Sequence, residues 1–531
     1  MSRPRATRSQ FSVFIKRIFE YSIPTMAEMR GRKLYIGGYC YVRSKKEKER
    51  IYWECQRRRD GECNARAITN NAPDVGGNVV VFKGPEESVH GHATNPEEVE
   101  AQKLTETLKR KAKDNPGQPP SQILRQELAG FDAGVLSQLP EREALSKAMR
   151  RERRRDLPAN PRTLSELEEV PRRFRRTLLG ECFLLYDSRE EVNEEERDSS
   201  GDEEEQPERN RVLVFATTRN LELLCQSTTW FLDGTFKTTP GLFTQIFTIL
   251  GLRTRIGGNN DSVALPFVFA LLSRKTEAQY TEVLNAVKDA VDEFNVSGAC
   301  VPERMMSDFE KGILNACNEV FPDAEVKGCF FHLGQSVYRR IQEEGLQAKY
   351  SDPHDRRIKR YTLMLLALAL VPLEDVKETF ALLERTFLEA DFKPVLRYFD
   401  KTYVNGVRAR GRRAAVQPRY PPAIWNHYES AKNKTHRTNN CSESWHNRFQ
   451  VVVGKHHPDL YSGLKELQKE QADVEAMVAE LSLGRTVRAA PKKKWVTFQE
   501  RIQAQVMEYE RYKEDGDVLL YLRTLSHNIN L

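Results

Sequence analysis

An aspartate inside an apolar run constrains this chain more than any other sequence feature. Residues 229–236 read Thr-Trp-Phe-Leu-Asp-Gly-Thr-Phe, the pattern of a buried strand that Asp233 interrupts. An ionised carboxylate in such surroundings is costly unless a cation or hydrogen-bond donors meet it. Asp233 is therefore the first candidate for a functional acid.

Two more acids occupy comparable positions. Asp308 ends a short apolar strand, and Glu443 lies at the start of a helical pattern. Carboxylates on separate elements can converge, and Mg²⁺ binds a few such oxygens together with substrate phosphates. Two metals about 4 Å apart activate water and stabilise the leaving oxygen in phosphodiester chemistry. We therefore predict a catalytic Mg²⁺ or Mn²⁺ site at Asp233, Asp308 and Glu443. Glu466 and Glu470 are alternative third ligands, although they are expected among ordinary surface charges.

Around these acids the chain resembles the transposase domain of Mutator-like elements. The matching stretches are 233–236, 265–271, 307–310, 328–333 and 437–446. The resemblance runs from about residue 212 into the C-terminal region, and all five stretches agree with it in order and spacing. It implies an RNase H-like core with an Asp-Asp-Glu triad, and DNA as the partner. The implied activity is strand cleavage at element ends, followed by attack of the freed 3′-OH on target DNA.

The resemblance also places a Cys-x-x-His, here Cys329 and His332, between the second Asp and the Glu. Packing and hydrogen bonding near the active site are its expected roles, with metal ligation or substrate contact as the alternative. His446 follows Glu443 by three residues and could contact the scissile strand.

The order of strand and helix patterns indicates the fold. The expected elements are strands at 229–236, 245–252 and 265–272, a helix at 280–291, a strand at 304–308, a helix at 311–321 and a strand at 324–329. Three antiparallel strands followed by βαβ units predict an RNase H-like α/β fold with a mixed sheet. Asp233 would lie on the first strand and Asp308 on the fourth, which are neighbours in that fold.

The N-terminal region carries a second metal pattern. Short β-type segments alternate with turns between residues 33 and 94, and their polar ends contain two cysteines and two histidines. These are Cys55, Cys63, His90 and His92. Two thiolates and two imidazoles form a closed tetrahedral set for structural Zn²⁺, which would supply much of the folding free energy of so small a module. The competing interpretation is that these are unrelated surface histidines and core cysteines.

This region resembles a FLYWCH-type zinc finger, through residues 52–55, 63–66 and 90–92. Such fingers imply DNA or protein recognition. The basic residues that could contact phosphate beside Tyr52 and Trp53 are Arg57, Arg58, Arg59 and Arg66. The alternative interpretation is that these arginines only keep a small domain soluble.

Charge is unevenly spread along the 531 residues, whose net charge is only +7. Basic clusters lie near 109–113, 150–155 and 172–176, and an acidic block lies at 190–208. A basic helix at 141–154, with Arg151 and Arg154, could bind DNA phosphates or the major groove. A solvated helix or a nuclear import signal is the alternative. Arg437 supplies further basic charge ahead of the third acid.

Composition excludes some classes of protein. No apolar stretch is long enough to span a bilayer, so a membrane partner is not expected. Nine cysteines are an odd number, and without a recognisable secretory signal they favour reduced thiols and metal ligation over disulfides. DNA chemistry and basic clusters favour a nuclear location.

Eight segments are expected. They are a disordered basic tail (1–29), a FLYWCH-like zinc finger (30–95), a helical, basic, candidate DNA-binding region (96–180), an acidic disordered linker (187–210), the first part of an RNase H-like core (211–340), an α-helical insertion (341–430), core completion with the catalytic Glu (431–485) and a C-terminal helical tail (486–531).

The leading hypothesis is a metal-dependent DNA transposase, and a homo-oligomer would suit it because two DNA ends must be joined. The rival hypothesis is a domesticated, transposase-derived DNA-binding or regulatory protein without catalysis. A nuclease on the same fold would share the acids but lack specificity for element ends.

Overall fold

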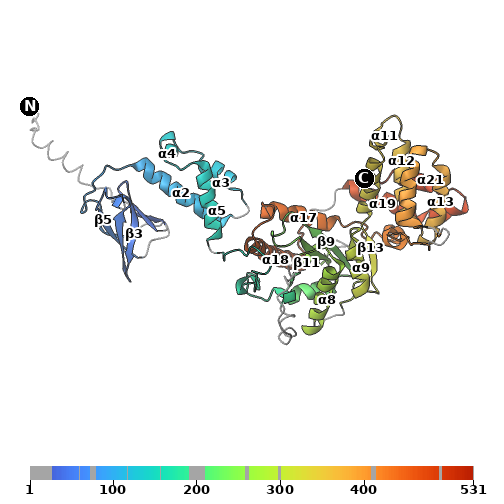
Figure 1. Ribbon diagram of the computed structural model, residues 1–531, viewed down its shortest axis with the longest axis horizontal. Coiled ribbons are helices and arrows are strands. Elements are labelled where there is room, and N and C mark those ends of the chain that lie inside the picture. The colour runs from blue at the N-terminus through green and yellow to red at the C-terminus, as the bar shows by residue number, and fades with distance from the viewer. Residues whose placement is uncertain are drawn as a thin grey trace, which may run out of the picture. The chain divides into compact units, whose positions relative to one another are not determined.

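The computed structural model describes residues 27–529, apart from residues 31, 59, 72–78, 116–117, 156, 190–209, 258–261, 297–299, 408, 410–413 and 489–492. The chain divides into two compact units, Met1–Leu157 and Pro158–Leu531. Figure 1 labels the elements of both. Nearly all of the expected basic tail and acidic linker, and Arg59, lie outside the described residues.

The N-terminal unit begins with an antiparallel sheet. Its strands, in spatial as well as chain order, are β1 (Glu28–Arg30), β2 (Lys33–Ile36), β3 (Tyr39–Lys46), β4 (Arg50–Cys55), β5 (Arg66–Asn70) and β6 (Val81–Lys83), with a short 3₁₀ turn at Gln56–Arg58. Alternate residues of β4 are buried, among them Ile51 and Trp53. The Trp53 indole donates a buried hydrogen bond of 2.8 Å to Thr69 Oγ1, which fixes this core residue.

Helices complete this unit. They are α2 (Pro96–Asp114), α3 (Pro120–Glu127), α4 (Ala133–Ser137) and α5 (Arg142–Arg154). The Asn95 side chain caps α2 by accepting from Glu98 N at 3.1 Å, and proline at the first helical position suits that start. Leu104, Leu108 and Ile123 pack with Leu145 and Met149 of α5 in a small separate core. The β-rich part and the helices therefore bury different apolar clusters.

A mixed sheet forms the centre of the C-terminal unit. Its strands are β7 (Leu184–Asp187), β8 (Val212–Phe215), β9 (Thr229–Thr235), β10 (Gln245–Thr254), β11 (Ser262–Leu272), β12 (Arg304–Ser307) and β13 (Glu325–Gly328). The spatial order is β13-β12-β9-β10-β11-β8-β7. Strands β9, β10 and β11 are antiparallel, whereas β12 runs parallel to both β9 and β13. The mixed α/β class and the expected neighbourhood of the first and fourth core strands are confirmed.

The register of β9 and β12 brings two acids level with each other. Thr229, Trp230 and Phe231 pair with Arg304, Met305 and Met306 in the parallel ladder. If this register is continued two residues beyond the Phe231–Met306 pair, Asp308 lies beside Asp233. Because side chains alternate along a strand, Asp233 shares a face of the sheet with Phe231 rather than with Trp230.

Helices cover both faces of this sheet. The elements around it are α7 (Thr218–Cys225), α8 (Glu277–Glu293), α9 (Lys311–Val320), α10 (Phe330–Glu343), α17 (Asn440–Val453) and α18 (Leu460–Ser482), with a 3₁₀ turn at Arg172–Phe174. Figure 1 shows α8 and α9 on one side of the sheet and α17 on the other. Asp233 faces the α17 side, since its carboxylate lies 3.7 Å from His446 Nδ1 of that helix.

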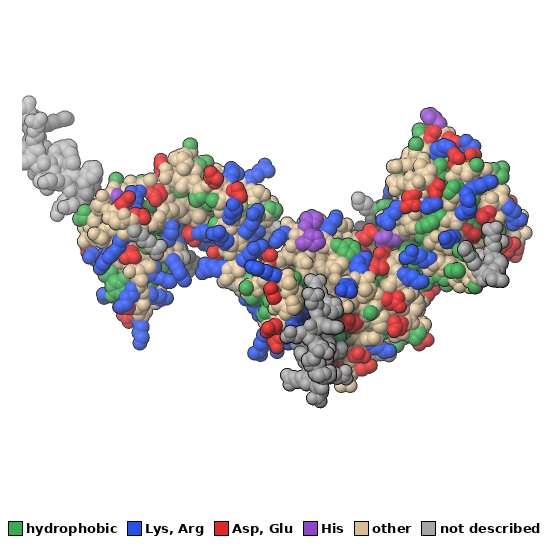
Figure 2. All heavy atoms as spheres, in the orientation of Figure 1, with side chains coloured by type: hydrophobic (Ala, Val, Ile, Leu, Met, Phe, Trp, Pro, Cys, Tyr) green, Lys and Arg blue, Asp and Glu red, His purple; other side chains and the backbone are tan. Residues whose placement is uncertain are grey.

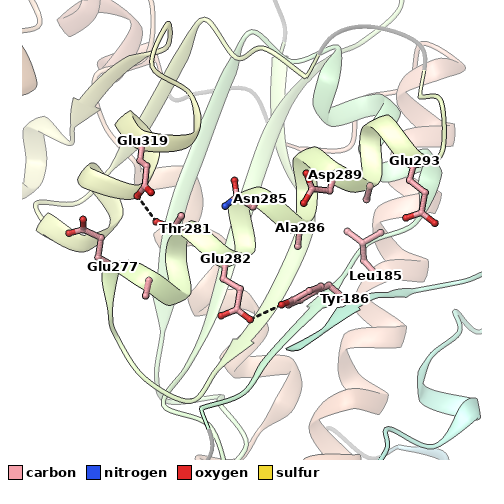
Figure 3. Close-up of a pocket in the computed structure, with 12 residues that line it drawn as sticks. Leu185, Tyr186, Glu277, Thr281, Glu282, Asn285, Ala286, Asp289, Glu293 and Glu319 are labelled. Atoms are coloured by element: carbon pink, nitrogen blue, oxygen red, sulfur yellow. Dashed lines mark hydrogen bonds between the residues drawn. The ribbon is translucent and has the colours of Figure 1, made fainter. Parts of the chain in front are cut away.

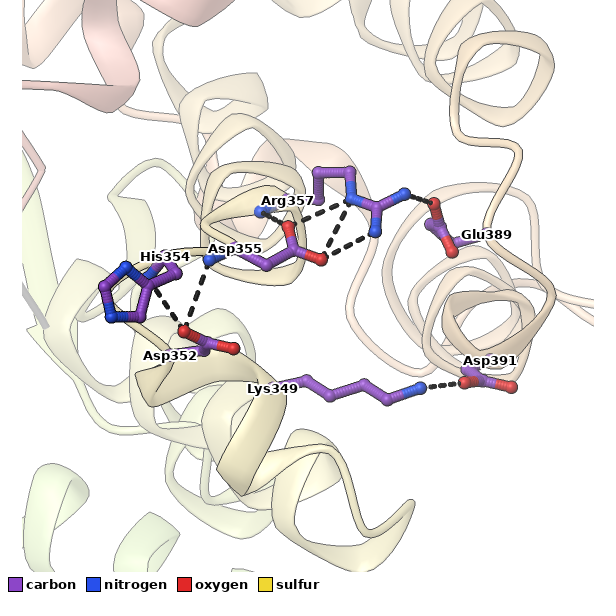
Figure 4. A network of polar contacts seen from close by, with 7 residues as sticks. All are labelled: Lys349, Asp352, His354, Asp355, Arg357, Glu389 and Asp391. Atoms are coloured by element: carbon purple, nitrogen blue, oxygen red, sulfur yellow. Dashed lines mark hydrogen bonds and ion pairs between the residues drawn. The ribbon is translucent and has the colours of Figure 1, made fainter.

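A helical region separates α10 from α17 in the chain. It contains α11 (Gln347–Ser351), α12 (Arg357–Ala367), α13 (Val376–Thr386), α14 (Lys393–Phe399), α15 (Pro422–Trp425) and α16 (Tyr428–Lys432), with 3₁₀ turns at Leu368–Leu370, Leu373–Asp375 and Ala390–Phe392 and a π-helical turn at Asp400–Val404. Figure 4 shows the exposed contacts at its outer end, where Arg357 joins Asp355 to Glu389 and Lys349 meets Asp391. The hydrogen bonds of Arg357 lower the pKa of Asp355 to about 2. Such exposed pairs add little stability.

The last helices pack on this helical region. They are α19 (Lys493–Met507), α20 (Tyr509–Glu514) and α21 (Val518–Ser526). The Tyr509 hydroxyl donates to Asp375 at 2.9 Å, and the Tyr521 hydroxyl donates to the Leu370 carbonyl at 2.5 Å. The end of the chain thus completes a core that begins more than a hundred residues earlier. Within the described residues, every helix is too short or too polar to cross a bilayer.

Candidate metal centres and DNA-binding surfaces

The two cysteines and two histidines of the N-terminal unit converge on one point. Cys55 Sγ lies 3.2 Å from His92 Nε2, Cys63 Sγ lies 3.4 Å from His90 Nδ1, and these two ring nitrogens are 3.3 Å apart. Bonds of about 2.0–2.3 Å in a tetrahedron separate ligand atoms by about 3.3–3.8 Å. The arrangement supports structural Zn²⁺, as expected from the sequence.

The outer nitrogens of both histidines are held as well. His90 Nε2 lies 2.6 Å from the Tyr41 hydroxyl, and His92 Nδ1 lies 2.9 Å from the Ala93 carbonyl. Tyr39 stacks on His90 with ring centroids 3.6 Å apart. Burial lowers the pKa of His90 to about 4, which keeps its imidazole neutral and able to donate a lone pair. These partners orient the ligands, as outer contacts do in zinc sites.

Gly91 explains why the two histidines can be so close in sequence. A Cβ atom at this position would lie 2.8 Å from the Glu62 carbonyl oxygen, so any larger residue would push the backbone away from the Cys63 loop. Cys40 is buried but does not join the cluster, in agreement with the expected ligand set.

The basic residues of the finger differ in what they offer to DNA. Arg57 contacts Glu62 and Glu98, and Arg58 pairs with Glu54. The Arg66 side chain is exposed on β5. Trp53, expected beside these arginines, is only 1% exposed and belongs to the core. The possible phosphate-contacting surface of the finger therefore lacks that tryptophan.

Asp233 is buried near the C-terminal end of β9. Its Oδ1 accepts a hydrogen bond of 2.8 Å from the Gly234 N–H. Burial and the negative charge of Asp308 raise the pKa of Asp233 to about 7, with a smaller contribution from Glu443. The surroundings of Asp233 therefore disfavour its ionised form, and a bound cation would stabilise that form.

Asp308 follows β12 directly. Its Oδ1 accepts from the Glu310 N–H at 3.1 Å, and burial together with the charge of Glu310 raises its pKa. The Glu310 carboxylate in turn accepts from the Tyr280 hydroxyl at 2.6 Å and pairs with Lys275 at 2.7 Å. The Lys275–Glu310 pair could not be predicted from the sequence, because it joins two separate segments of the chain.

Glu443 lies in the first turn of α17 and contacts His332 of α10. The distance from His332 Nε2 to Glu443 Oε1 is 3.3 Å. Burial by itself would lower the pKa of His332, but contacts with Cys329 and Glu443 and the charge of Asp308 raise it to about 10. His332 therefore carries a positive charge among the three acids. Its Nδ1 is buried without a partner among the described residues.

His446 is one turn further along α17. Burial lowers its pKa to about 4, so the ring is neutral, and its Nε2 is buried without a partner in the described part of the chain. Asp233, Asp308, Glu443, His332 and His446 thus share one electrostatic environment. Their ligand atoms are more widely spaced than the zinc set, which is the one cluster of three or more such groups within 4.8 Å among the described residues.

Asn439 forms hydrogen bonds that connect the elements on which the acids and histidines lie. Its Nδ2 donates to the Leu232 carbonyl on β9 at 3.0 Å, and its backbone N–H donates to Cys329 Sγ at 3.2 Å. The Ser442 hydroxyl donates to Asn439 Oδ1 at 2.6 Å. The side chain is fully buried. Cys329 thus serves as a hydrogen-bond acceptor between β13 and the start of α17.

Two side chains near this site, Arg437 and Glu470, differ from expectation. Arg437 is only 9% exposed and hydrogen-bonds Gln499 of α19, which leaves little of its guanidinium for DNA phosphate. Glu470 was expected among surface charges, but it is buried, accepts from the Trp445 indole at 2.7 Å and pairs with Arg448. Trp445 stacks on Phe449 and buttresses α17. Contacts between distant segments produce each of these differences.

A large hollow lies elsewhere in this unit, along α8 and beside β7. Figure 3 shows Glu282, which accepts from the Tyr186 hydroxyl at 2.9 Å, and Glu319, which accepts from Thr281 at 3.0 Å. Asp289 and Glu293 also line it. The negative charge of this surface would repel polyanions.

Comparisons with protein families agree with these observations. Residues 25–91 match the FLYWCH zinc finger domain, and residues 229–336 match the MULE transposase domain. A comparison with curated proteins gave no match. The second match includes Asp233, Asp308, Cys329 and His332 and ends before Glu443. The chain therefore combines an N-terminal FLYWCH zinc finger domain with a MULE transposase domain.

Proposed function

We propose that this chain is a DNA transposase, in which Asp233, Asp308 and Glu443 hold the divalent cations used for strand cleavage and strand transfer. The observation that carries the proposal is electrostatic. Burial and the charges of the other two acids raise the pKa of Asp233 to about 7, although the acids come from three distant parts of the chain. Such a cluster is costly by itself and gains stability from a bound cation.

The donors fit the proposed metals. Three carboxylates supply the hard oxygen ligands that Mg²⁺ and Mn²⁺ prefer. The chemistry that such ions supply is activation of water and of the 3′-OH, and stabilisation of the leaving oxygen. In this chain, Gly234 N–H orients Asp233, and His332 holds Glu443 at 3.3 Å. The His446 ring lies beside Asp233, with its Nδ1 3.7 Å from the carboxylate.

The partners proposed for this function are element ends and target DNA. The FLYWCH domain, with Arg66 exposed, supports DNA recognition by the N-terminal unit. We also propose a homo-oligomer, because two ends must be brought together, and a nuclear location, because the DNA is there.

A strand-cleavage assay tests the proposal. The DNA would carry the terminal sequences that flank the coding region, and the reaction would contain purified full-length protein with Mg²⁺ or Mn²⁺. The proposal predicts nicks at the element ends and joined products, all dependent on the divalent ion. DNA that remains intact under conditions in which the protein binds it would contradict the enzymatic proposal.

One observation favours a second candidate function, a DNA-binding or regulatory protein without catalysis. Glu443 is engaged by His332, and the three carboxylates are more widely spaced than the zinc ligands. A protein without catalytic activity could retain the His332–Glu443 contact and the wide spacing of the carboxylates. The same assay separates the two, because this candidate predicts DNA binding with no divalent-ion-dependent products.

A further inference from the structure

Helix α5 carries a stripe of basic residues opposite its buried face. The basic stripe consists of Lys147, Arg150, Arg151 and Arg154. Spacings of three, four and seven residues place these on one side of a helix. All four are exposed, whereas Leu145 and Met149 are buried. At about 100° per residue, the middle of the stripe lies about 180° around the helix from these two apolar side chains.

Not every basic residue of α5 is available to a partner. Arg153 is used within the unit, since its Nε donates to the Ala112 carbonyl at 2.8 Å and its Nη2 donates to the Asn115 carbonyl at 3.0 Å. It thereby joins α5 to the end of α2. Arg150 and Arg151 differ from it, because neither has an ion pair or hydrogen bond to another described side chain.

The charge of α5 matches a polyanion. Six basic and two acidic residues give the helix a net charge of +4. Figure 2 shows Lys and Arg side chains gathered over the helical part of the N-terminal unit. A straight helix of this length is about 20 Å long and 10–12 Å wide, which fits the major groove of B-DNA, about 12 Å wide.

We propose that the basic stripe of α5 binds duplex DNA, with Arg150 and Arg151 contacting phosphates at the edges of one groove. The inference rests on the proposed function and deepens it, because it assigns a DNA-binding surface outside both segments that match a family. The zinc finger and α5 belong to the same compact unit and would both contribute to binding.

The test compares full-length, zinc-loaded proteins by fluorescence anisotropy on a labelled duplex of about three helical turns. Salt would be varied between about 50 and about 200 mM. The test variant is the double substitution Arg150→Ala and Arg151→Ala. The control is Arg125→Ala with Arg142→Ala, which removes the same charge from exposed sites on α3 and at the start of α5. Circular dichroism would verify that both variants keep the wild-type melting temperature.

The proposal predicts that the test variant binds about 30- to 100-fold more weakly near 0.1 M salt. The slope of log affinity against log salt should fall by about 2, while the control variant stays within about threefold of wild type. If the test variant binds DNA with wild-type affinity, or if both variants lose affinity equally, the inference is overturned and the proposed function is unaffected. A wild-type protein that does not bind DNA would overturn both.

Discussion

The Asn439 side chain donates a hydrogen bond of 3.0 Å to the backbone carbonyl of Leu232, the residue that precedes Asp233. Asn439 and Leu232 are 207 residues apart in the chain. The backbone of Asn439 also donates to Cys329, so one residue joins the strand, the β13 end and the helix that carry the acids. The position of Glu443 relative to Asp233 therefore depends on a side chain that is not itself an acid.

Replacing Asn439 by alanine should destabilise the C-terminal unit by about 1–3 kcal/mol, because a buried carbonyl and a buried hydroxyl would lose their partner. Calorimetric unfolding measures this. The matched control is Asn440→Ala, since Asn440 is exposed. Equal melting temperatures for both variants would show that Asn439 does not hold these elements together.

Asp233 should make stability depend on pH in the absence of magnesium. Its pKa is raised to about 7 in the folded chain, so the folded state holds this proton more tightly than the unfolded state. The resulting stability is present below the unfolded pKa near 4 and is lost as pH rises through about 7. Asp233→Asn should therefore melt higher than wild type at pH 8 and close to it at pH 4.

Added Mg²⁺ supplies the control for that comparison. It should raise the melting temperature of wild type at pH 8 clearly more than that of Asp233→Asn, because the variant lacks one of the three anionic ligands. The same rise in both proteins would place magnesium binding elsewhere.

Zinc content tests the N-terminal cluster independently of DNA. Full-length Cys63→Ala and Gly91→Ala proteins should lose the zinc, about one ion per chain, that wild type carries. The second variant acts sterically, through the 2.8 Å approach to the Glu62 carbonyl. Cys40→Ala should retain zinc, since Cys40 is buried outside the cluster. Elemental analysis that finds full zinc in Cys63→Ala would remove it from the ligand set.

His332 should act through Glu443. Replacing it by asparagine removes the 3.3 Å contact that holds the Glu443 carboxylate in place. Outer contacts of this kind are worth about 10- to 100-fold in metal affinity or activity. We expect a higher Mg²⁺ requirement for strand cleavage, with His354→Asn, at an exposed loop shown in Figure 4, as the control. An unchanged Mg²⁺ titration would limit His332 to packing.

Sequence reasoning succeeded where a residue conflicted with its neighbours. Asp233 in an apolar run and the Cys and His residues at strand ends stood out locally, and the order of strand patterns predicted the central pairing of β9 with β12. It failed where a contact joins distant segments. The sequence around Glu470 does not predict its hydrogen bond to Trp445, and the sequence around Arg437 does not predict its burial against α19.

If the three acids hold cations for DNA cleavage, the substitution Asp308→Asn should abolish that cleavage. Asp308 lies level with Asp233 through the β9–β12 register, and the substitution keeps shape while removing the charge. The measurement is Mn²⁺-dependent strand cleavage beside DNA affinity for the same protein preparation. We predict that cleavage falls below detection while DNA affinity stays within about threefold, because phosphate binding resides in basic surfaces. Cleavage at the wild-type rate by Asp308→Asn would contradict the account.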